Sequence, residues 1–355
     1  MKTWKTGLSR SSWLAGALLQ LGLFGAAQVQ ADYATHPQAQ AFVDEMVAEH
    51  GFEADELQGW LTKAERKQSI LDAIARPAEK TKPWKDYRKI FLTADRTRKG
   101  VSFWQEHRET LERAEKEYGV PASMIVSIIG VETRYGRHKG SYRVMDALST
   151  LAFDYPKRSK FFRKELKHFL VLAREQSQDP LALKGSYAGA MGYGQFMPSS
   201  YREYAVDFDG DGFTDIWNNP VDAIGSVANY FRRHGWQPGE AVVSRARLNN
   251  GYDKALPNAT LKPVHTVSKL DKAGFSPLED YPADAPVSII RLEGDNGAEF
   301  WMGRKNFYVI TRYNHSRLYA MSVYQLSLAI ADAMEQQAKL DRKVSDTPSV
   351  SAKAS

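Results

Sequence analysis

Cysteine is absent from this chain of 355 residues. Its absence excludes disulfide bonds, and it also excludes a lipid anchor attached through an N-terminal cysteine once a signal segment is removed. A chain of this length can fold without cross-links, because 43% of its residues are hydrophobic and 12% are aromatic. We therefore expect a sizeable core and more than one sub-domain, held together by packing alone.

A hydrophobic run long enough to cross a membrane as a helix is also missing. The nearest approach is at the N-terminus, where Lys2, Lys5 and Arg10 precede an apolar run over 13–24. Small and polar residues then lead to Ala31, a suitable cleavage point. The pattern predicts a signal peptide over 1–31 and a mature protein that is exported and soluble.

The chain carries little net charge. The formal charge is +6, but three of the positive charges lie in the predicted signal peptide, which leaves 45 basic and 42 acidic residues. Lys and Arg form no dense stripe in the sequence, so nucleic acid is not an expected partner. A mild positive excess suits an anionic polymer such as the cell wall.

The spacing of the apolar residues indicates an α+β fold that is mainly α. We predict five segments after the signal peptide: an N-terminal helical region (32–105), a core (106–236), a β-rich insertion (237–305), a return to the core (306–338) and a disordered tail (339–355). The sequence contains no internal repeat.

Some elements can be predicted individually. One helix is expected over 103–118, and a shorter one over 146–153 with Asp146 as its N-terminal cap. Asn296-Gly297 between two apolar runs predicts a β-hairpin. Residues 306–313 are predicted to form a further strand, and 321–337 a helix.

Glu132 interrupts an apolar helical stripe. Isoleucines recur at i, i+3 and i+4 of a helix that begins near Pro121, and Glu132 follows at i+7. A buried carboxyl group is harder to ionise, so we expect a raised pKa that suits a general acid. The alternative is a structural glutamate near a helix end that pairs with Arg134 or Arg137.

A glycine-rich segment covers residues 184–198, with four glycines in the ten residues from Gly185 to Gly194. Such a composition is a poor helix, but it allows a backbone to approach a ligand closely. The segment matches neither a phosphate-binding loop nor a dinucleotide fingerprint, because the lysine and the preceding strand are missing.

Residues 207–215 fit the template of a calcium-binding loop, with Gly212 at the sharp turn of position six. The expected ligands are the side chains at positions one, three, five and nine and the carbonyl at position seven: Asp207, Asp209, Asp211, Asp215 and Phe213. Position twelve is Asn218 instead of Glu, which predicts weak binding or a shortened loop closed by Asp215. The alternative is a polar turn that binds nothing. If the ion binds, its role is structural: it joins the glycine-rich segment to the helix that follows.

Three blocks, in order along the chain, resemble the lytic murein transglycosylases of the MltB type (family 3). They are residues 129–136 around Glu132, 189–199 in the glycine-rich segment, and 221–231 after the Asp-rich loop, within a similarity that extends from about 35 to 337. The resemblance implies a lysozyme-like, mostly helical core with a small β-rich insertion. The best-known form of that family is an outer-membrane lipoprotein, and this chain, without cysteine, resembles the soluble periplasmic form.

Family roles are carried over only where residues match. The resemblance implies that Glu132 is the catalytic acid and that the Asp-rich loop binds calcium as a structural ion. Positions that line the glycan cleft in the family are occupied here by Tyr87, Arg158, Ser186, Gln195, Tyr313, Asn314 and Tyr319. Lys157 departs from an arginine of the family, and the two are not interchangeable. The tyrosines could instead be core residues or stacking platforms.

The expected chemistry follows from how few carboxylates accompany Glu132. A hydrolytic glycosidase needs two, and the sequence nearby offers only Asp146, explained as a cap, and Asp154. The resemblance implies a single-acid mechanism on peptidoglycan strands, in which Glu132 protonates the bond between N-acetylmuramic acid and N-acetylglucosamine. It then accepts the proton of the C6 hydroxyl, so that a 1,6-anhydro ring closes without water.

The implied protein is a monomer without an organic cofactor, and cell-wall synthesis proteins are candidate partners. Two alternatives remain open: a hydrolytic muramidase that uses the same glutamate with water, and a non-catalytic peptidoglycan-binding protein.

Overall fold

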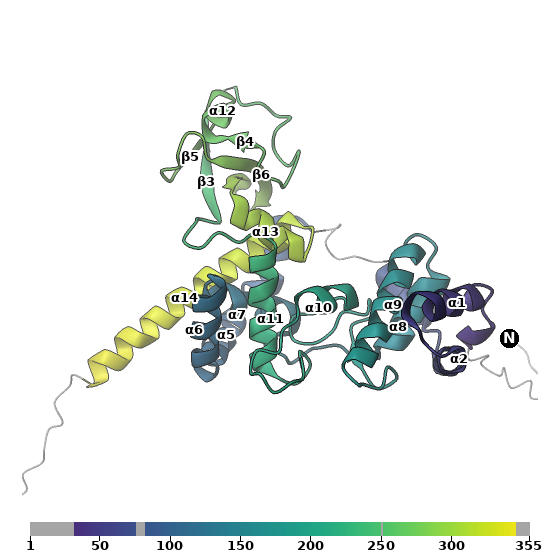
Figure 1. The fold of residues 1–355 in the computed structure, drawn as a ribbon. Coiled ribbons are helices and arrows are strands. Elements are labelled where there is room, and N and C mark those ends of the chain that lie inside the picture. Colours follow the sequence, from purple (N-terminus) through teal and green to yellow (C-terminus); the bar gives the residue numbers. More distant parts are fainter. Residues whose placement is uncertain (1–31, 76–81, 250, 346–355) are drawn as a thin grey trace, which may run out of the picture. The chain divides into compact units, whose positions relative to one another are not determined.

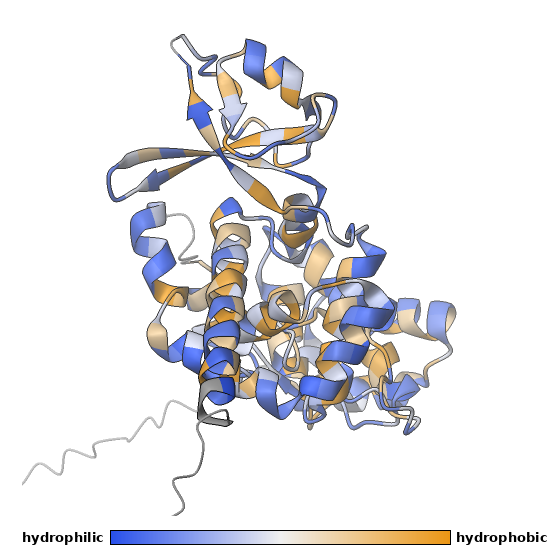
Figure 2. Ribbon diagram, turned by 90° about the vertical axis from the view of Figure 1, so that its left-hand side faces the viewer, coloured by the Kyte–Doolittle hydropathy of each residue, from blue (hydrophilic) through white to orange (hydrophobic). Residues whose placement is uncertain are grey.

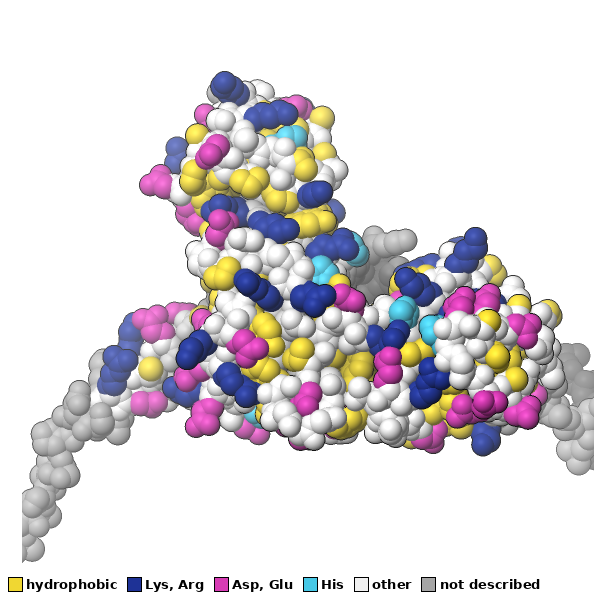
Figure 3. All heavy atoms as spheres, in the orientation of Figure 1, with side chains coloured by type: hydrophobic (Ala, Val, Ile, Leu, Met, Phe, Trp, Pro, Cys, Tyr) yellow, Lys and Arg dark blue, Asp and Glu magenta, His cyan; other side chains and the backbone are white. Residues whose placement is uncertain are grey.

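The structure, a computed structural model, describes residues 32–75, 82–249 and 251–345. The predicted signal peptide and the end of the tail lie outside these residues. Among the described residues, no helix is both long and apolar enough to cross a bilayer. Figure 3 shows basic and acidic side chains interspersed on the visible face, as the small net charge leads us to expect.

Helices make up most of the chain before residue 240 (Figure 1). After the short turn η1 (Tyr33–Thr35) they are α1 (Ala39–His50), α2 (Ala54–Lys63), α3 (Gln68–Ile74), α4 (Trp84–Phe91), α5 (Ala94–Glu106), α6 (Arg108–Tyr118), α7 (Ala122–Thr133), α8 (Val144–Asp154), α9 (Ser159–Glu175), α10 (Pro198–Tyr204) and α11 (Pro220–Arg233). A two-residue ladder pairs β1 (Tyr142–Arg143) with β2 (Lys184–Gly185). The prediction of a mainly helical α+β protein is confirmed.

The helix predicted over 103–118 is wrong as a single element. The chain leaves helical geometry at His107 (ψ 29°), whose ring lies 4.4 Å from that of Phe103. α5 packs on α7 and α14, whereas α6 packs mainly on α11 and α7. Because the two halves serve different neighbours, the chain turns between them although its residues favour helix throughout.

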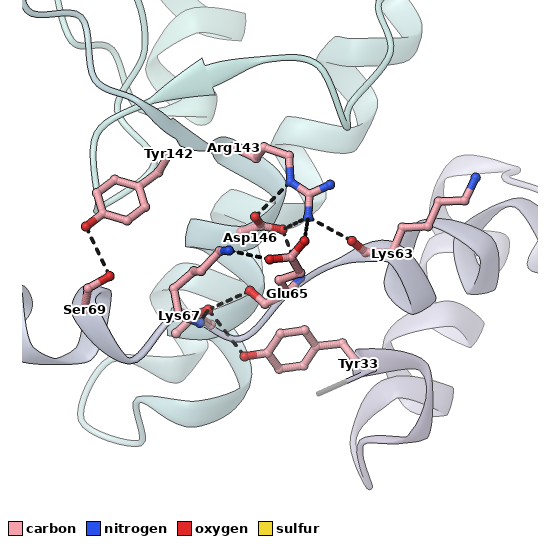
Figure 4. Close-up of polar contacts among 9 residues, drawn as sticks. Tyr33, Lys63, Glu65, Lys67, Ser69, Tyr142, Arg143 and Asp146 are labelled. Carbon is pink, nitrogen blue, oxygen red and sulfur yellow. Dashed lines mark hydrogen bonds and ion pairs between the residues drawn. The ribbon is translucent and has the colours of Figure 1, made fainter. Parts of the chain in front are cut away.

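Asp146 is not the cap of α8, as the sequence predicted. The N-cap position belongs to Arg143, and Asp146 lies in the first turn, 2% exposed. Its carboxylate accepts hydrogen bonds from the Arg143 guanidinium at 2.8 Å and from the Glu65 amide at 2.9 Å (Figure 4). The Arg143 guanidinium also contacts the Glu65 carboxylate at 3.1 Å. The buried aspartate therefore joins the chain after α2 to α8, and its role is structural.

α7 is buried on nearly all sides, which is the pattern of a central helix. It packs against α14, α5, α6 and α11. Figure 2 shows the hydrophobic residues concentrated along the helices at the centre of this arrangement. The Ser127 hydroxyl donates to the carbonyl of Val323 at 2.7 Å, so α7 is bonded to α14 as well as packed against it.

The insertion contains a five-stranded antiparallel sheet in the order β4-β6-β7-β3-β5. Its strands are β3 (Val243–Leu248), β4 (His265–Thr266), β5 (Phe275–Pro277), β6 (Pro286–Gly294) and β7 (Gly297–Gly303), with the helix α12 (Val267–Lys272) between β4 and β5. The predicted hairpin is confirmed, although its two turn residues are Asp295 and Asn296, because Gly297 already pairs with Gly294. A small hydrophobic cluster of its own, around Leu270, Phe275 and Val287, stabilises the insertion.

The strand predicted over 306–313 is wrong, because these residues form the helix α13 (Lys305–Tyr313). Their aromatic and β-branched side chains suit a strand. Phe307, Ile310 and Thr311 nevertheless recur at helical spacing and are buried. The buried Asn306 amide also fixes the start of the helix, through hydrogen bonds to both backbone groups of Gln237 at 2.8 Å. Tertiary contacts thus override the local preference.

The last helix, α14 (Arg317–Ser345), begins before the predicted 321–337 and extends beyond it. At 1.5 Å per residue its 29 residues span about 43 Å. The tail predicted to be disordered over 339–355 is therefore helical as far as Ser345.

Candidate active site

Glu132 lies one residue before the C-terminal end of α7 and is half-buried. The end of this helix is held by a buried side chain that the sequence analysis missed, Arg96 of α5. Its guanidinium donates to the carbonyls of Gly130, Val131 and Ile90. Gly130 and Val131 lie in the last turn of α7 and Ile90 in the last turn of α4, so Arg96 connects the ends of these two helices. Arg96 sits in a charged stretch of sequence, and nothing there distinguishes it from a surface arginine.

Tyr319 of α14 donates its hydroxyl hydrogen to Glu132 Oε1 at 2.6 Å. The ring is buried, and burial raises the Tyr319 pKa well above its usual value, with a further increase from the Glu132 charge. Tyr319 therefore stays protonated and remains a hydrogen-bond donor to the carboxyl group. The structure thus brings together two predicted site residues that are 187 positions apart.

Tyr313 and Tyr87 belong to the same cluster. Burial raises the Tyr313 pKa, and the Glu132 charge raises it further. Its hydroxyl donates to the Gly194 carbonyl at 2.6 Å, so α13 is bonded to the glycine-rich segment. Tyr87 of α4 is buried and contributes to the raised pKa of Tyr319.

The glycine-rich segment is bonded to α7 directly after Glu132. The Thr133 hydroxyl, another residue that the sequence analysis missed, bridges its own helix at Ile129 (3.1 Å) to the carbonyl of Tyr193 (3.0 Å). A Cβ on Gly194 would lie 2.8 Å from the Tyr313 hydroxyl. The absence of a side chain at Gly194 therefore allows the backbone of this segment to pack closely against Tyr313.

Ser186 and Gln195 hold the glycine-rich segment in shape. Ser186 Oγ accepts hydrogen bonds from the amides of Ala188 (3.3 Å) and Ala190 (3.1 Å). Gln195 has a left-handed backbone (φ 52°), and its side-chain amide donates to the carbonyls of Lys139 and Gly192 at 3.2 and 3.0 Å. Both side chains thus stabilise the conformation of the segment. Their contact with a glycan stays a prediction.

The remaining predicted contacts lie at other positions. Arg158 is the exposed N-cap residue of α9, with its guanidinium 4.3 Å from the Phe161 ring centre. Asn314 follows Tyr313 at the end of α13 and is half-buried, and its carbonyl accepts from the Ser316 amide at 2.7 Å.

Asp146 and Asp154, the next two carboxylates after Glu132 in the chain, are engaged elsewhere. Asp146 binds Arg143 and the Glu65 amide, as described above. Asp154 accepts the Tyr33 hydroxyl at 2.6 Å and lies 3.3 Å from the Arg66 guanidinium. Both therefore belong to the contacts of the N-terminal helices, and neither is placed as a partner of Glu132 in catalysis.

The Asp-rich loop has a donor set that fits a divalent cation. The carboxylate oxygens of Asp207, Asp209 and Asp211 lie within 4.8 Å of one another and are exposed. A hydrogen bond from the Gly212 amide is the main cause of a lowered pKa at Asp207. Carboxylate oxygens are the ligands that Ca²⁺ prefers, so the triad can hold such an ion. Asp215 Oδ1 accepts from the amides of Trp217 and Asn218, and its coordination of a metal, like that of the Phe213 carbonyl, stays a prediction.

Asp222 closes this loop, although the sequence analysis gave it no role. Fully buried, it accepts from the amides of Phe208 and Asp215, each at 2.7 Å. The two ends of the loop are therefore fixed to the start of α11 by the protein itself. The available signal was an acid three residues after Asn219, the N-cap of that helix.

Comparisons with known proteins agree with this geometry. Residues 34–328 match the family model described as "Transglycosylase SLT domain". Membrane-bound lytic murein transglycosylase B of Escherichia coli K12 is 49% identical over 318 residues, which cover 87% of each chain. Among solved structures, the catenated lytic transglycosylase SltB1 of Pseudomonas aeruginosa has 57% identity and a TM-score of 0.82, and covers 85% of this chain and all of its own.

The lytic transglycosylase Slt35 of Escherichia coli, solved in complex with calcium, has 48% identity and a TM-score of 0.79, and covers 86% of this chain and 96% of its own. The chain belongs to the MltB/Slt35 family of lytic murein transglycosylases.

Proposed function

We propose that this protein is a lytic transglycosylase of peptidoglycan in which Glu132 is the single acid and base. The reaction class is supported by the chain's membership of the family. The observation that carries the residue assignment is the hydrogen bond from the buried Tyr319 to Glu132, inside a cluster of tyrosines and beside the glycine-rich segment. Asp146 and Asp154, the second acids that a hydrolytic enzyme could use, are engaged with other helices.

In the proposed reaction, protonated Glu132 gives its proton to the glycosidic oxygen between N-acetylmuramic acid and N-acetylglucosamine. The bond from that oxygen to C1 of the muramoyl sugar breaks, and the sugar's own N-acetyl group stabilises the positive charge on C1. The Glu132 carboxylate then takes the proton of the C6 hydroxyl, whose oxygen bonds to C1. The acid is regenerated and water is not consumed. Holding the sugar so that C6 faces C1 makes this internal attack effective.

Tyr319 has a clear part in this cycle. Its hydroxyl stabilises the carboxylate that exists between the two proton transfers, and it fixes the orientation of the group. The remaining residues predicted to line the glycan cleft are Tyr87, Arg158, Ser186, Gln195, Tyr313 and Asn314. We propose that they contact the sugars, supported by their match to the family and, for the tyrosines, by their proximity to Glu132.

The decisive experiment is mass spectrometry of purified cell wall after digestion. Release of 1,6-anhydromuramoyl ends is expected, whereas reducing ends alone would assign the chain to the hydrolytic alternative. Glu132→Gln should abolish release while binding to the wall persists. A Glu132→Gln protein that still cleaves walls would refute the assignment of the acid. A wild-type protein that binds walls without releasing any fragment would favour the non-catalytic alternative.

For the Asp-rich loop we propose a structural calcium ion held by Asp207, Asp209, Asp211 and Asp215 with the Phe213 carbonyl. The exposed carboxylate triad and the calcium in the Slt35 structure support this. A chelator should lower the melting temperature, and added calcium should restore it. An Asp209→Asn, Asp211→Asn variant should show no such difference, and an unchanged wild-type melting temperature would exclude a stabilising ion.

We further propose that the protein acts in the periplasm as a monomer, exported by the signal peptide over 1–31, and that the segments 32–105, 106–236, 237–305 and 306–338 form its divisions. Fractionation of cells that produce the full chain tests the location. The sheet of the insertion, between the helices of 106–236 and 306–338, supports the division. Nucleic acid is not a proposed partner, and wall-synthesis proteins remain candidates that co-purification would test.

A further inference from the structure

A pocket of about 640 Å³ lies beside the tyrosine cluster, and the proposed reaction gives it no role. We call it the insertion pocket. Four segments line it: residues 82–84 at the start of α4, residues 258–261 and 291–293 of the insertion, and residues 315–318 at the start of α14. The segments at the starts of α4 and α14 are each followed closely in the chain by a tyrosine of the cluster near Glu132. Tyr87 stands one helical turn after Trp84, about 5–6 Å along the same face, and Tyr319 is the next residue after Leu318.

The wall of the pocket formed by the insertion is built before any ligand arrives. Asn258, with a left-handed backbone (φ 63°), accepts from the Arg291 amide at 2.9 Å and donates to the Arg291 carbonyl at 3.0 Å. The backbone amide of Asn258 also donates to the carbonyl of Ile289 at 2.9 Å. The loop over 258–261 is thus fixed to β6 through Asn258.

The opposite wall is equally well fixed. α4 packs against both β6 and α14, and Trp84 at its start is only 1% exposed. The Arg88 guanidinium lies 3.9 Å from the Asp295 carboxylate in the turn between β6 and β7. The pocket therefore lies between two fixed elements, α4 and β6.

The lining offers many donors and little negative charge. Lys82, Arg291 and Arg317 are exposed cations of the lining, and its one acid, Glu293, is already paired with Arg291 at 2.6 Å. Two helices also begin here, α4 and α14, and the amides at a helix start carry partial positive charge. These features together favour an anion with acceptor oxygens.

We propose that the insertion pocket binds the carboxylate groups of the stem peptide, which hangs from the muramic acid residues of the glycan strand. The inference rests on the proposed function, because a strand bound at Glu132 is what brings the peptide to the pocket. A stem of four residues reaches about 13 Å when extended. That length covers the short path from Tyr319 through Leu318 to Arg317.

The experiment compares two substrates and three proteins. The substrates are glycan strands with tetrapeptide stems and the same strands after an amidase has removed the stems. The proteins are the wild type, an Arg291→Ala, Arg317→Ala double variant, and an Arg247→Ala control. Arg247 is an exposed cation of the same insertion, outside the pocket lining, and its loss changes the charge in the same direction.

For the double variant we expect a KM about tenfold higher on strands with stems, an unchanged kcat, and unchanged constants on bare strands, the size expected for two partly exposed charged hydrogen bonds. Wild-type protein should lose the same factor on strands whose stem carboxylates have been converted to amides, and the control should match the wild type. A double variant equal to the wild type on strands with stems, or weakened equally on bare strands, would overturn the proposal. Failure of the proposed function is recognised separately, because bare strands would then yield no anhydro ends with wild-type protein.

Discussion

Replacing Tyr319 by Phe tests the central hydrogen bond of the site. The substitution removes one oxygen from a buried ring and leaves Glu132 without its 2.6 Å donor. A hydrogen bond to a charged group contributes about 1.5–3 kcal/mol, against about 1 kcal/mol for one to a neutral group. The hydroxyl therefore favours the ionised carboxyl over the neutral one by the difference between these values, about 0.5–2 kcal/mol, which is on the order of one pH unit in a titration.

The sign follows directly. Tyr319 stabilises the ionised form of Glu132 through this hydrogen bond, so its loss should favour the protonated form. Cleavage needs a protonated Glu132 at its first step, and activity falls on the alkaline side where the proton is lost. In Tyr319→Phe that alkaline limb should move to higher pH by about one unit. The assay is kcat/KM for release of anhydro products over a series of buffers at constant ionic strength.

Tyr313→Phe is the matched control, because it removes the same oxygen from a neighbouring ring whose hydroxyl bonds to the Gly194 carbonyl instead of Glu132. Its pH limb should stay close to that of the wild type, even if activity falls. A limb that does not move in Tyr319→Phe, or that moves equally in both variants, would refute the reasoning.

Three further predictions concern stability, each measured by urea unfolding. Gly194→Ala should cost about 1–3 kcal/mol, because its Cβ would lie 2.8 Å from the Tyr313 hydroxyl; an unchanged midpoint would show that the ring moves aside freely. Asp146→Ala should cost about 3 kcal/mol, since an arginine and an amide lose a buried acceptor, and a loss below half of that would make the contact incidental. Burial raises the pKa of Glu165, which accepts the Ser199 amide and hydroxyl. In the wild type this group's contribution to stability therefore falls as pH rises from 4.5 through its folded pKa, and Glu165→Gln should fall less over the same range. Parallel curves would contradict the burial argument.

Local signals in the sequence predicted the features whose physical cause is itself local. Glu132 could be found because a carboxylate replaced an apolar residue at a fixed helical spacing. The Asp-rich loop could be found because alternating ligands and a turn glycine lie within nine residues. The hairpin of β6 and β7 follows from two residues whose backbone suits a tight turn. In each case the residues that determine the feature are neighbours in the chain.

Features that depend on distant residues could not be predicted in the same way. Residues 306–313 have strand-forming side chains, and they become helical because Asn306 binds the backbone of Gln237. Asp146 has the composition of a cap, but the Glu65 amide, 81 residues away, turns it into an anchor. That Tyr319 would donate to Glu132 was not visible from spacing, because the two residues meet only through the packing of α7 on α14.

The packing of α7 on α14 determines how much of the site is ordered before substrate binds. Ser127 bonds to Val323, and five residues further along α7 Glu132 meets Tyr319, four residues back along α14. The two helices therefore run antiparallel and are cross-linked at both places. In the proposed reaction, the acid and its hydrogen-bond donor therefore already contact each other before a sugar chain arrives. Little of the substrate's binding energy is consumed in ordering the protein, and the remainder is available to distort the sugar itself.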